Sequence, residues 1–194
     1  MEINFLSLNK SQNKKILLLH GLFTSSGYWM PYLGYLRNYH LIIPHINYDE
    51  LLANIDKNLP ILNDQISNFS NIDNVISHSF GCVLSNVLTF DSNFINICPV
   101  QESQIINRVN FIYEIAKISK QDHELIEKTI NESAQLYSKI KNTNSNKKII
   151  QMFPNDDIYF HYKTNNIGNK FIFEGDHFEI KNAFKEICKK KYLY

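Results

Sequence analysis

The fold is decided by residues 73–90, which read DNVISHSFGCVLSNVLTF. The segment from Asp73 to Ile76 is a short apolar run typical of a strand buried in a parallel sheet, and residues 82–90 predict an apolar helix. Between the two lies Ser79, at the kind of sharp turn that pushes a hydroxyl above the edge of a sheet. The stretch therefore predicts a strand, a tight turn and a helix, with Ser79 at the turn.

The turn sequence Ser77-His78-Ser79-Phe80-Gly81 is a variant of the pattern G-x-S-x-G. Small residues are needed two positions before and two positions after the central serine, because the turn brings the strand and helix backbones together. Gly81 satisfies this requirement, and Ser77 stands where the pattern has glycine. Two interpretations follow: Ser79 is a nucleophile, or the segment is an ordinary strand-to-helix turn that contains a serine.

Other apolar runs extend this pattern along the chain. We expect strands at residues 14–19, 40–44, 94–100, 148–153 and 170–173, and helices at 28–39 and 180–192. Residues 48–69 have helical spacing that we expect Pro60 to interrupt. Alternating strands and helices predict an α/β fold, with a mostly parallel central sheet and helices on both faces. The length of 194 residues fits a single domain, residues 1–194.

A long insertion separates the strand that ends near Val100 from the strand that starts near Lys148. Residues 101–146 carry apolar residues at helical intervals, so we expect two or three helices that form a small lid. The basic residues of the lid are Arg108, Lys117, Lys120, Lys128, Lys139 and Lys141. They suggest docking of an acidic carrier protein, although a charged helix face is more often simply solvated.

Composition and charge narrow the classes of partner. Twenty basic and nineteen acidic side chains leave a net charge of +1, so no broad field steers the chain to nucleic acid or to an anionic membrane. No apolar run approaches the roughly 20 residues that span a bilayer, and the first residues show no leader pattern. We therefore expect a cytoplasmic protein with no nucleic-acid partner and no membrane span. The chain has three cysteines, Cys82, Cys98 and Cys188. They lack metal-binding spacing, and we expect all three to be buried thiols.

A serine hydroxyl becomes a nucleophile only with a base, an acid that orients the base, and two N–H donors for the oxyanion. His177, in the sequence GDHF, follows the last expected strand, where the base belongs in the chain order Ser, Asp, His. The acid is expected just after the strand at 148–153. Asp156 is the first choice there, and a shift of one residue selects Asp157 instead.

The segment HGLF at residues 20–23 follows the strand at 14–19 and supplies the rest of the expected site. We expect the oxyanion donors to be the backbone N–H groups of Leu22 and Phe80. The substrate pocket is expected to include His20, Gly21, Phe23 and His78, with His20 mainly structural. The other histidines lack the spacing of metal ligands, and there is no glycine-rich phosphate loop, so neither a metal nor a cofactor is expected.

With these motifs in place, the chain resembles the α/β-hydrolase superfamily from about Lys14 to its end. The motifs that carry the resemblance are LLLHG at 17–21, SHSFGC at 77–82, NDD at 155–157 and GDHF at 175–178. Within the superfamily the chain is similar to compact serine hydrolases with almost no lid, and to carboxylesterases that include the pimeloyl-carrier-protein methyl esterase of biotin synthesis. The segment PHINYD at 44–49 replaces a D-x-P-G-x-G-x-S loop common in the family, which favours the compact group, while the helical insertion favours a lidded esterase.

The resemblance implies hydrolysis of a carboxylic ester or thioester through an acyl-enzyme intermediate, without a cofactor. The substrate would be a small acyl ester or thioester, either free or presented by an acyl carrier protein. Two alternatives stay open at this point. One is a non-catalytic protein of the same fold that binds a ligand or partner, and the other is an acyltransferase or thioesterase that uses the same triad.

Overall fold

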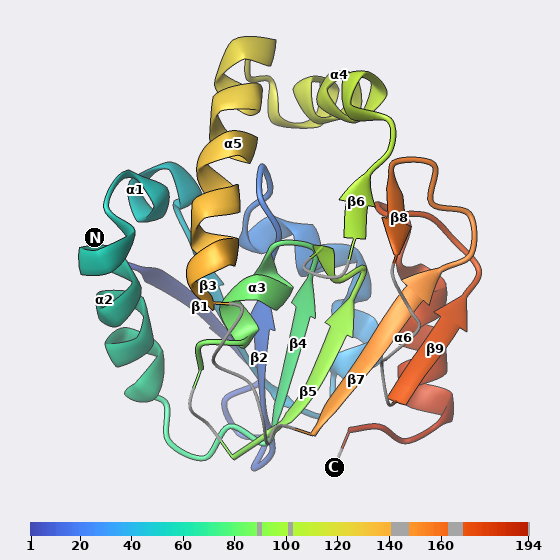
Figure 1. Ribbon diagram of the computed structural model, residues 1–194. Helices are drawn as coiled ribbons and strands as arrows, with labels where there is room; N and C mark the ends of the chain where they lie inside the picture. Colours follow the sequence, from blue (N-terminus) through green and yellow to red (C-terminus); the bar gives the residue numbers. More distant parts are fainter. Residues whose placement is uncertain (89–90, 101–102, 141–147, 163–168, 194) are drawn as a thin grey trace.

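The computed structural model describes residues 1–88, 91–100, 103–140, 148–162 and 169–193 (Figure 1). At its centre is a seven-stranded sheet with the order β1-β3-β2-β4-β5-β7-β9. Its strands are β1 (Asn4–Leu8), β2 (Lys15–Leu19), β3 (His40–His45), β4 (Asn74–His78), β5 (Asn93–Ile97), β7 (Ile149–Pro154) and β9 (Asn169–Phe173). Strand β1 pairs antiparallel with β3 at one edge, and the others run parallel. The predicted mostly parallel sheet is confirmed.

Helices cover both faces of the sheet, because successive side chains of each central strand point to opposite sides. In β2, Leu17 and Leu19 pack into the apolar cluster under α1 (Tyr48–Ala53), α2 (Ile55–Ser67) and α3 (Gly81–Ser85). Ile16 and Leu18 pack on the other side, under the 3-10 helix η1 (Ser26–Leu36) and α6 (Lys181–Lys189). All four of these side chains are fully buried, so β2 has the continuous apolar sequence of a central parallel strand.

Several local expectations from the sequence need correction. The expected helix at 28–39 is a 3-10 helix that begins at Ser26. Pro60 lies inside α2 rather than interrupting it, because the buried face of this helix, formed by Ile55, Leu62 and Ile66, continues across the proline. The segment is instead divided at Asn54, between α1 and α2. The helix expected at 82–90 is shorter than predicted, because α3 ends at Ser85 and residues 86–87 form a turn; residues 89–90 lie outside the described part.

The three cysteines do not share one environment. Cys82 and Cys98 are buried, as expected, and burial raises the pKa of both thiols. Cys188 is exposed, because it lies near the end of α6 and outside the buried stripe formed by Ala183, Phe184 and Ile187. The expectation of three buried thiols is therefore wrong for Cys188.

The insertion between β5 and β7 contributes a short strand and two helices: β6 (Ser103–Ile105), α4 (Arg108–Ser119) and α5 (His123–Ile140). Figure 1 shows these elements beyond the carboxyl ends of the parallel strands, where β6 pairs antiparallel with β8 (Phe160–Tyr162). Phe111 and Ile115 of α4 and Ile126 of α5 form a small apolar cluster with Phe160. The predicted lid also included residues 101–102 and 141–146, which lie outside the described residues.

Among the residues that the structure describes, no helix is both long and apolar enough to cross a membrane.

Candidate active site

Ser79 occupies a strained turn between β4 and α3. Its φ of 53° lies in the left-handed region, which a non-glycine residue adopts only when the surroundings enforce it. Its N–H donates to the Ile97 carbonyl oxygen at 3.0 Å. A Cβ atom on Gly81 would lie 2.4 Å from the carbonyl oxygen of Leu19, so only glycine lets α3 approach β2 this closely. The turn predicted from the sequence is therefore present.

Ser77 replaces the glycine of the usual pattern and is fully buried in β4. Its hydroxyl donates to Oδ1 of Asn96 on the neighbouring strand β5 at 2.7 Å. The Ser85 hydroxyl of α3 donates to the Cys82 carbonyl oxygen at 2.8 Å and lies 3.2 Å from the same Asn96 Oδ1. Because the added hydroxyl has a buried partner, serine is accommodated where the pattern has glycine.

His177 lies directly against Ser79. Its Nε2 is 2.9 Å from the Ser79 Oγ, although the two residues are 98 positions apart in the chain. His177 is buried, with its side chain 2% exposed, and its imidazole stacks on the Phe160 ring with the ring centroids 4.4 Å apart. The rigid aromatic wall fixes the orientation of the ring, which a base needs if it is to take the proton of Ser79.

Asp157, and not Asp156, is the carboxylate beside His177. Its Oδ2 lies 3.3 Å from the His177 Nδ1, and its Oδ1 accepts the backbone N–H groups of Tyr159 and Phe160 at 2.8 and 3.0 Å. Asp156 is exposed, and its backbone N–H donates to the Gly175 carbonyl oxygen. The first choice from the sequence is thus not the residue that the structure brings to His177.

Charge favours the ionised form of the Asp157 carboxyl. Burial alone would raise its pKa, but the hydrogen bond and charge of His177, followed by the hydroxyl of Tyr162, outweigh burial and hold the pKa below its usual range. Asp157 is therefore a carboxylate at neutral pH. It can stabilise the imidazolium that forms when His177 accepts a proton.

Leu22 and Phe80, whose backbone N–H groups are the expected oxyanion donors, both line the cavity that contains Ser79. Among the described residues, no hydrogen bond uses either of these two donors. Gly21 brings the first of them close, because a Cβ atom on Gly21 would lie 2.9 Å from the Cβ of Ser79. Two free donors beside a nucleophile are the arrangement that binds an oxyanion.

His20 anchors this loop and does not line the cavity, contrary to the expectation that it forms part of the substrate pocket. Its Nε2 accepts the N–H of Ile46 at 3.1 Å, so its Nδ1 carries the proton and donates to the Gly21 carbonyl oxygen at 3.0 Å. Burial lowers the pKa of His20 to about 4, and the neutral ring is kept. The hydroxyl of Tyr48 also donates to the His20 carbonyl oxygen.

His78 lines the cavity and contacts the backbone of His177. Its Nε2 lies 2.8 Å from the carbonyl oxygen of His177, which can only accept, so this nitrogen carries a proton. The ring stacks on Tyr28 with a centroid distance of 4.7 Å. Burial, and then the charge of His177, lower the pKa of His78 to about 3, so His78 stays neutral.

The cavity beside Ser79 is small and apolar. Its volume is about 80 Å³. The apolar residues of its wall include Leu22, Phe23, Val100, Ile105, Phe111, Ile115, Ile130, Phe160 and Phe178. No Lys or Arg occurs among the described residues that line it. An outer cavity of about 280 Å³ lies beyond the same Val100, Ile130 and Phe160, with Arg108 in its wall.

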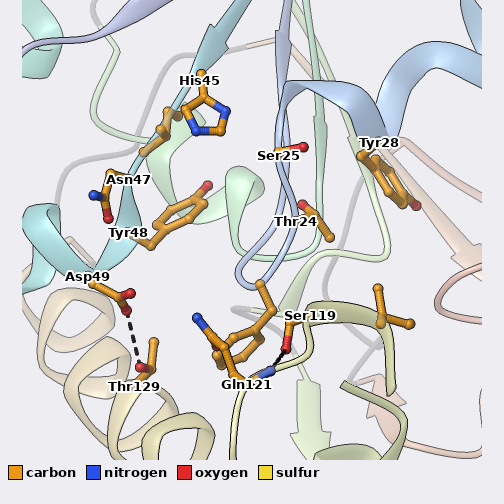
Figure 2. A pocket seen from close by; sticks show the side chains of 13 residues that line it. Thr24, Ser25, Tyr28, His45, Asn47, Tyr48, Asp49, Ser119, Gln121 and Thr129 are labelled. Carbon is orange, nitrogen blue, oxygen red and sulfur yellow. Dashed lines mark hydrogen bonds between the residues drawn. The ribbon is translucent and has the colours of Figure 1, made fainter. Parts of the chain in front are cut away.

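An open cleft of about 470 Å³ begins at Phe23 and Thr24, which also line the cavity of Ser79. Figure 2 shows its polar walls, which come from the loop after β2, the segment after β3, and the connection between α4 and α5. At one end Thr129 of α5 donates to the carboxylate of Asp49 on α1 at 3.4 Å (Figure 2). The cleft therefore lies between the insertion and the core.

Neither the known protein families nor the curated proteins contain a match to this sequence. Solved structures do match. They include an α/β hydrolase fold protein from Burkholderia ambifaria (TM-score 0.63, 12% identity, 97% of this chain and 93% of that chain). Others are carboxylesterase CesB from Bacillus subtilis (0.64, 11%, 97% and 86%) and an epoxide hydrolase from Bacillus megaterium (0.60, 10%, 98% and 95%). The protein has the α/β-hydrolase fold.

Proposed function

We propose that this protein is a serine hydrolase that cleaves a carboxylic ester or thioester through an acyl-enzyme intermediate. One observation carries the proposal: the hydroxyl of Ser79, the imidazole of His177 and the carboxylate of Asp157 lie in contact in that order, at 2.9 and 3.3 Å. This is the order of groups that nucleophilic catalysis by serine requires. Similarity to a carboxylesterase supports the same class of reaction.

The reaction follows from the geometry. The Ser79 Oγ attacks the carbonyl carbon while its proton passes to the His177 Nε2, and the N–H groups of Leu22 and Phe80 hold the oxyanion. The tetrahedral intermediate collapses and expels an alkoxide or thiolate, which takes the proton from the imidazolium. Water then attacks the acyl group and gives a proton to His177. Ser79 finally recovers a proton as the carboxylic acid leaves.

The cavity favours a short, uncharged acyl group. Its volume of about 80 Å³ is about half of a cavity of roughly 150 Å³ that holds benzene. An acyl chain of two to four carbons fits such a space, and its apolar walls offer no counter-ion to a second carboxylate. The open polar cleft that begins at Phe23 and Thr24 would take the alcohol or thiol part.

A carrier protein is a weaker candidate for the partner. Three basic residues of the insertion already have acidic neighbours, because Arg108 lies 3.3 Å from Glu127, Lys117 lies 2.8 Å from Glu114, and Lys128 lies 3.8 Å from Glu132. Their charge is therefore partly neutralised within the insertion. We propose a small ester or thioester as the substrate in preference to a pimeloyl ester on a carrier protein.

Turnover of p-nitrophenyl acetate, butyrate and octanoate by the wild type and by Ser79→Ala tests the proposal. Removing one member of a triad costs about 10⁴- to 10⁶-fold, so the variant should show no turnover above background while its thermal unfolding stays unchanged. Turnover by folded Ser79→Ala at the wild-type rate would refute the assignment. Product analysis with added alcohols distinguishes hydrolysis from acyl transfer, because a transferase would form a new ester.

A further inference from the structure

Tyr162 of β8 lies between the acid and the base. Its hydroxyl oxygen is 2.6 Å from the Asp157 Oδ2 and 3.1 Å from the His177 Nδ1. The direct distance from Nδ1 to Oδ2 is longer, at 3.3 Å. The base therefore has two oxygen neighbours on the side away from Ser79, and the nearer one belongs to the tyrosine.

The positions of the protons follow from what each group can do. The Asp157 carboxylate only accepts, so the short contact at 2.6 Å is a hydrogen bond that the Tyr162 hydroxyl donates. The phenol oxygen is then left as an acceptor for a proton on the His177 Nδ1. A proton on Nδ1 leaves Nε2 free to accept the proton of Ser79, which is the tautomer that a base requires.

We propose that Tyr162 is a positioning residue that bridges His177 and Asp157 and holds the imidazole in its reactive tautomer. This inference rests on the proposed function. The phenol does not itself take part in proton transfer to the substrate, because it touches neither Ser79 nor the cavity that holds the acyl group.

The fold supports this role in two ways. Tyr162 is fixed by the pairing of β8 with β6, in which it lies opposite Ser103, and by contact of its ring with Phe153 at 5.3 Å. Burial is the main cause that raises the pKa of Tyr162 far above its usual value, and the neighbouring Cys98 and the Asp157 carboxylate raise it further. The hydroxyl therefore keeps its proton at every pH at which the enzyme works, and it remains a donor to Asp157.

Tyr162→Phe removes only the bridging oxygen. We expect kcat for p-nitrophenyl acetate to fall roughly 10- to 100-fold, as for loss of a hydrogen bond to a charged group, with KM changed less than about twofold. Tyr35→Phe is the matched control, because Tyr35 lies in η1, packs against Phe184 of α6 and does not line the cavity at Ser79, so this variant should keep the wild-type kcat. A kcat of Tyr162→Phe within twofold of the wild type would overturn the proposal.

A double-mutant cycle separates positioning from a general structural effect. If Tyr162 acts through Asp157, Tyr162→Phe should lower kcat less than about twofold when Asp157→Ala is already present. An equal loss in both backgrounds would show independent effects and overturn the proposal. The two failures are distinguishable. If the proposed function is wrong, Ser79→Ala retains activity; if only this inference is wrong, Ser79→Ala is inactive while Tyr162→Phe keeps the wild-type kcat.

A probe that keeps the hydroxyl covers the case in which Tyr162→Phe does not fold. Incorporation of 3-fluorotyrosine at position 162 alone gives a ¹⁹F signal next to His177. We expect this signal to shift when a fluorophosphonate bonds to the Ser79 Oγ and releases fluoride and the hydroxyl proton to the solvent, because His177 then loses the hydroxyl partner of its Nε2. It should also shift in Asp157→Ala, where the phenol loses the carboxylate that accepts its proton. A signal that stays constant under both treatments would contradict contact between the two side chains.

Discussion

A Cβ atom on Gly21 would lie 2.9 Å from the Cβ of Ser79 and 3.4 Å from its Oγ. The loop that carries the Leu22 N–H thus touches the candidate nucleophile through a glycine. This contact links two segments that are far apart in the sequence, and it places the loop of one proposed oxyanion donor against the proposed nucleophile.

Gly21→Ala should therefore lower activity much more than stability. The added methyl group must displace Ser79 or the loop, which misplaces the oxyanion donor, and loss of one such donor costs about 10²- to 10³-fold in kcat. We expect kcat to fall by about 10²-fold and the melting temperature to change by only a few degrees. Gly34→Ala is the control, because a Cβ atom there meets nothing within 4 Å. Equal activity in the two variants would contradict this account.

The two adjacent aspartates provide a matched pair of variants. Asp157→Asn should lower kcat by about 10⁴-fold, because an amide can hold the imidazole in the wrong tautomer. Asp156→Asn should keep kcat within about twofold, since the Asp156 side chain is exposed. Steady-state kinetics of both variants, with circular dichroism as a check on folding, decides between them. A large loss in Asp156→Asn alone would restore the first choice made from the sequence.

Ile130 separates the small cavity at Ser79 from the outer cavity beside Arg108, because it lines both. Ile130→Ala should join the two cavities. The ratio of kcat/KM for the octanoate ester to kcat/KM for the butyrate ester should then rise by about tenfold, because an apolar pocket that gains room for methylene groups binds longer chains better. Val109→Ala is the control, because Val109 is 78% exposed. An unchanged ratio in Ile130→Ala would show that the acyl chain does not pass this residue.

Stability should fall in mild acid because of two buried histidines. Folding lowers the pKa of His20 to about 4 and of His78 to about 3, below the ordinary value of 6.5. The unfolded chain therefore binds more protons than the folded protein between these values, and the free energy of unfolding decreases as pH falls through this window. Each histidine contributes a slope of up to about 1.4 kcal/mol per pH unit.

Urea unfolding at pH 7, 6 and 5 measures this slope. His78→Gln should reduce the slope of unfolding free energy against pH by up to the contribution of one bound proton. His123→Gln, at an exposed position on α5, should leave the slope unchanged. Greater stability at pH 5 than at pH 7, or the same slope in His78→Gln, would contradict the assignment of these neutral buried rings.

The sequence predicts the central strands well because their signal is local. Ile16 to Leu19 form a continuous apolar run, and every one of them is buried between two layers of helices. Strand β1 is not predicted by a continuous apolar run, because it is a half-exposed edge strand in which Ser7 interrupts the apolar residues. The three-residue strands β6 and β8 are too short to have a pattern of their own, and their pairing is decided by tertiary packing.

In the site, too, the residues marked by local sequence motifs can be predicted, whereas those placed by tertiary contacts cannot. The turn at Ser79 and the position of His177 after the last strand are readable from short motifs, whereas the choice between Asp156 and Asp157 depends on one loop conformation. A local signal does exist, since an aspartate often accepts the N–H groups two and three residues later, as Asp157 does from Tyr159 and Phe160. No motif indicates Tyr162, because its contact with His177 requires the distant β6–β8 pairing.

The central claim is that Ser79 is activated by His177, and a fluorophosphonate probe tests it most directly. Intact-mass and peptide mass spectrometry of the labelled protein should show one adduct, located on Ser79. The adduct should be absent in Ser79→Ala and should form at least about 10³-fold more slowly in His177→Ala, because the unassisted hydroxyl is a weak nucleophile. An adduct on another residue, or labelling of folded His177→Ala at the wild-type rate, would contradict the claim.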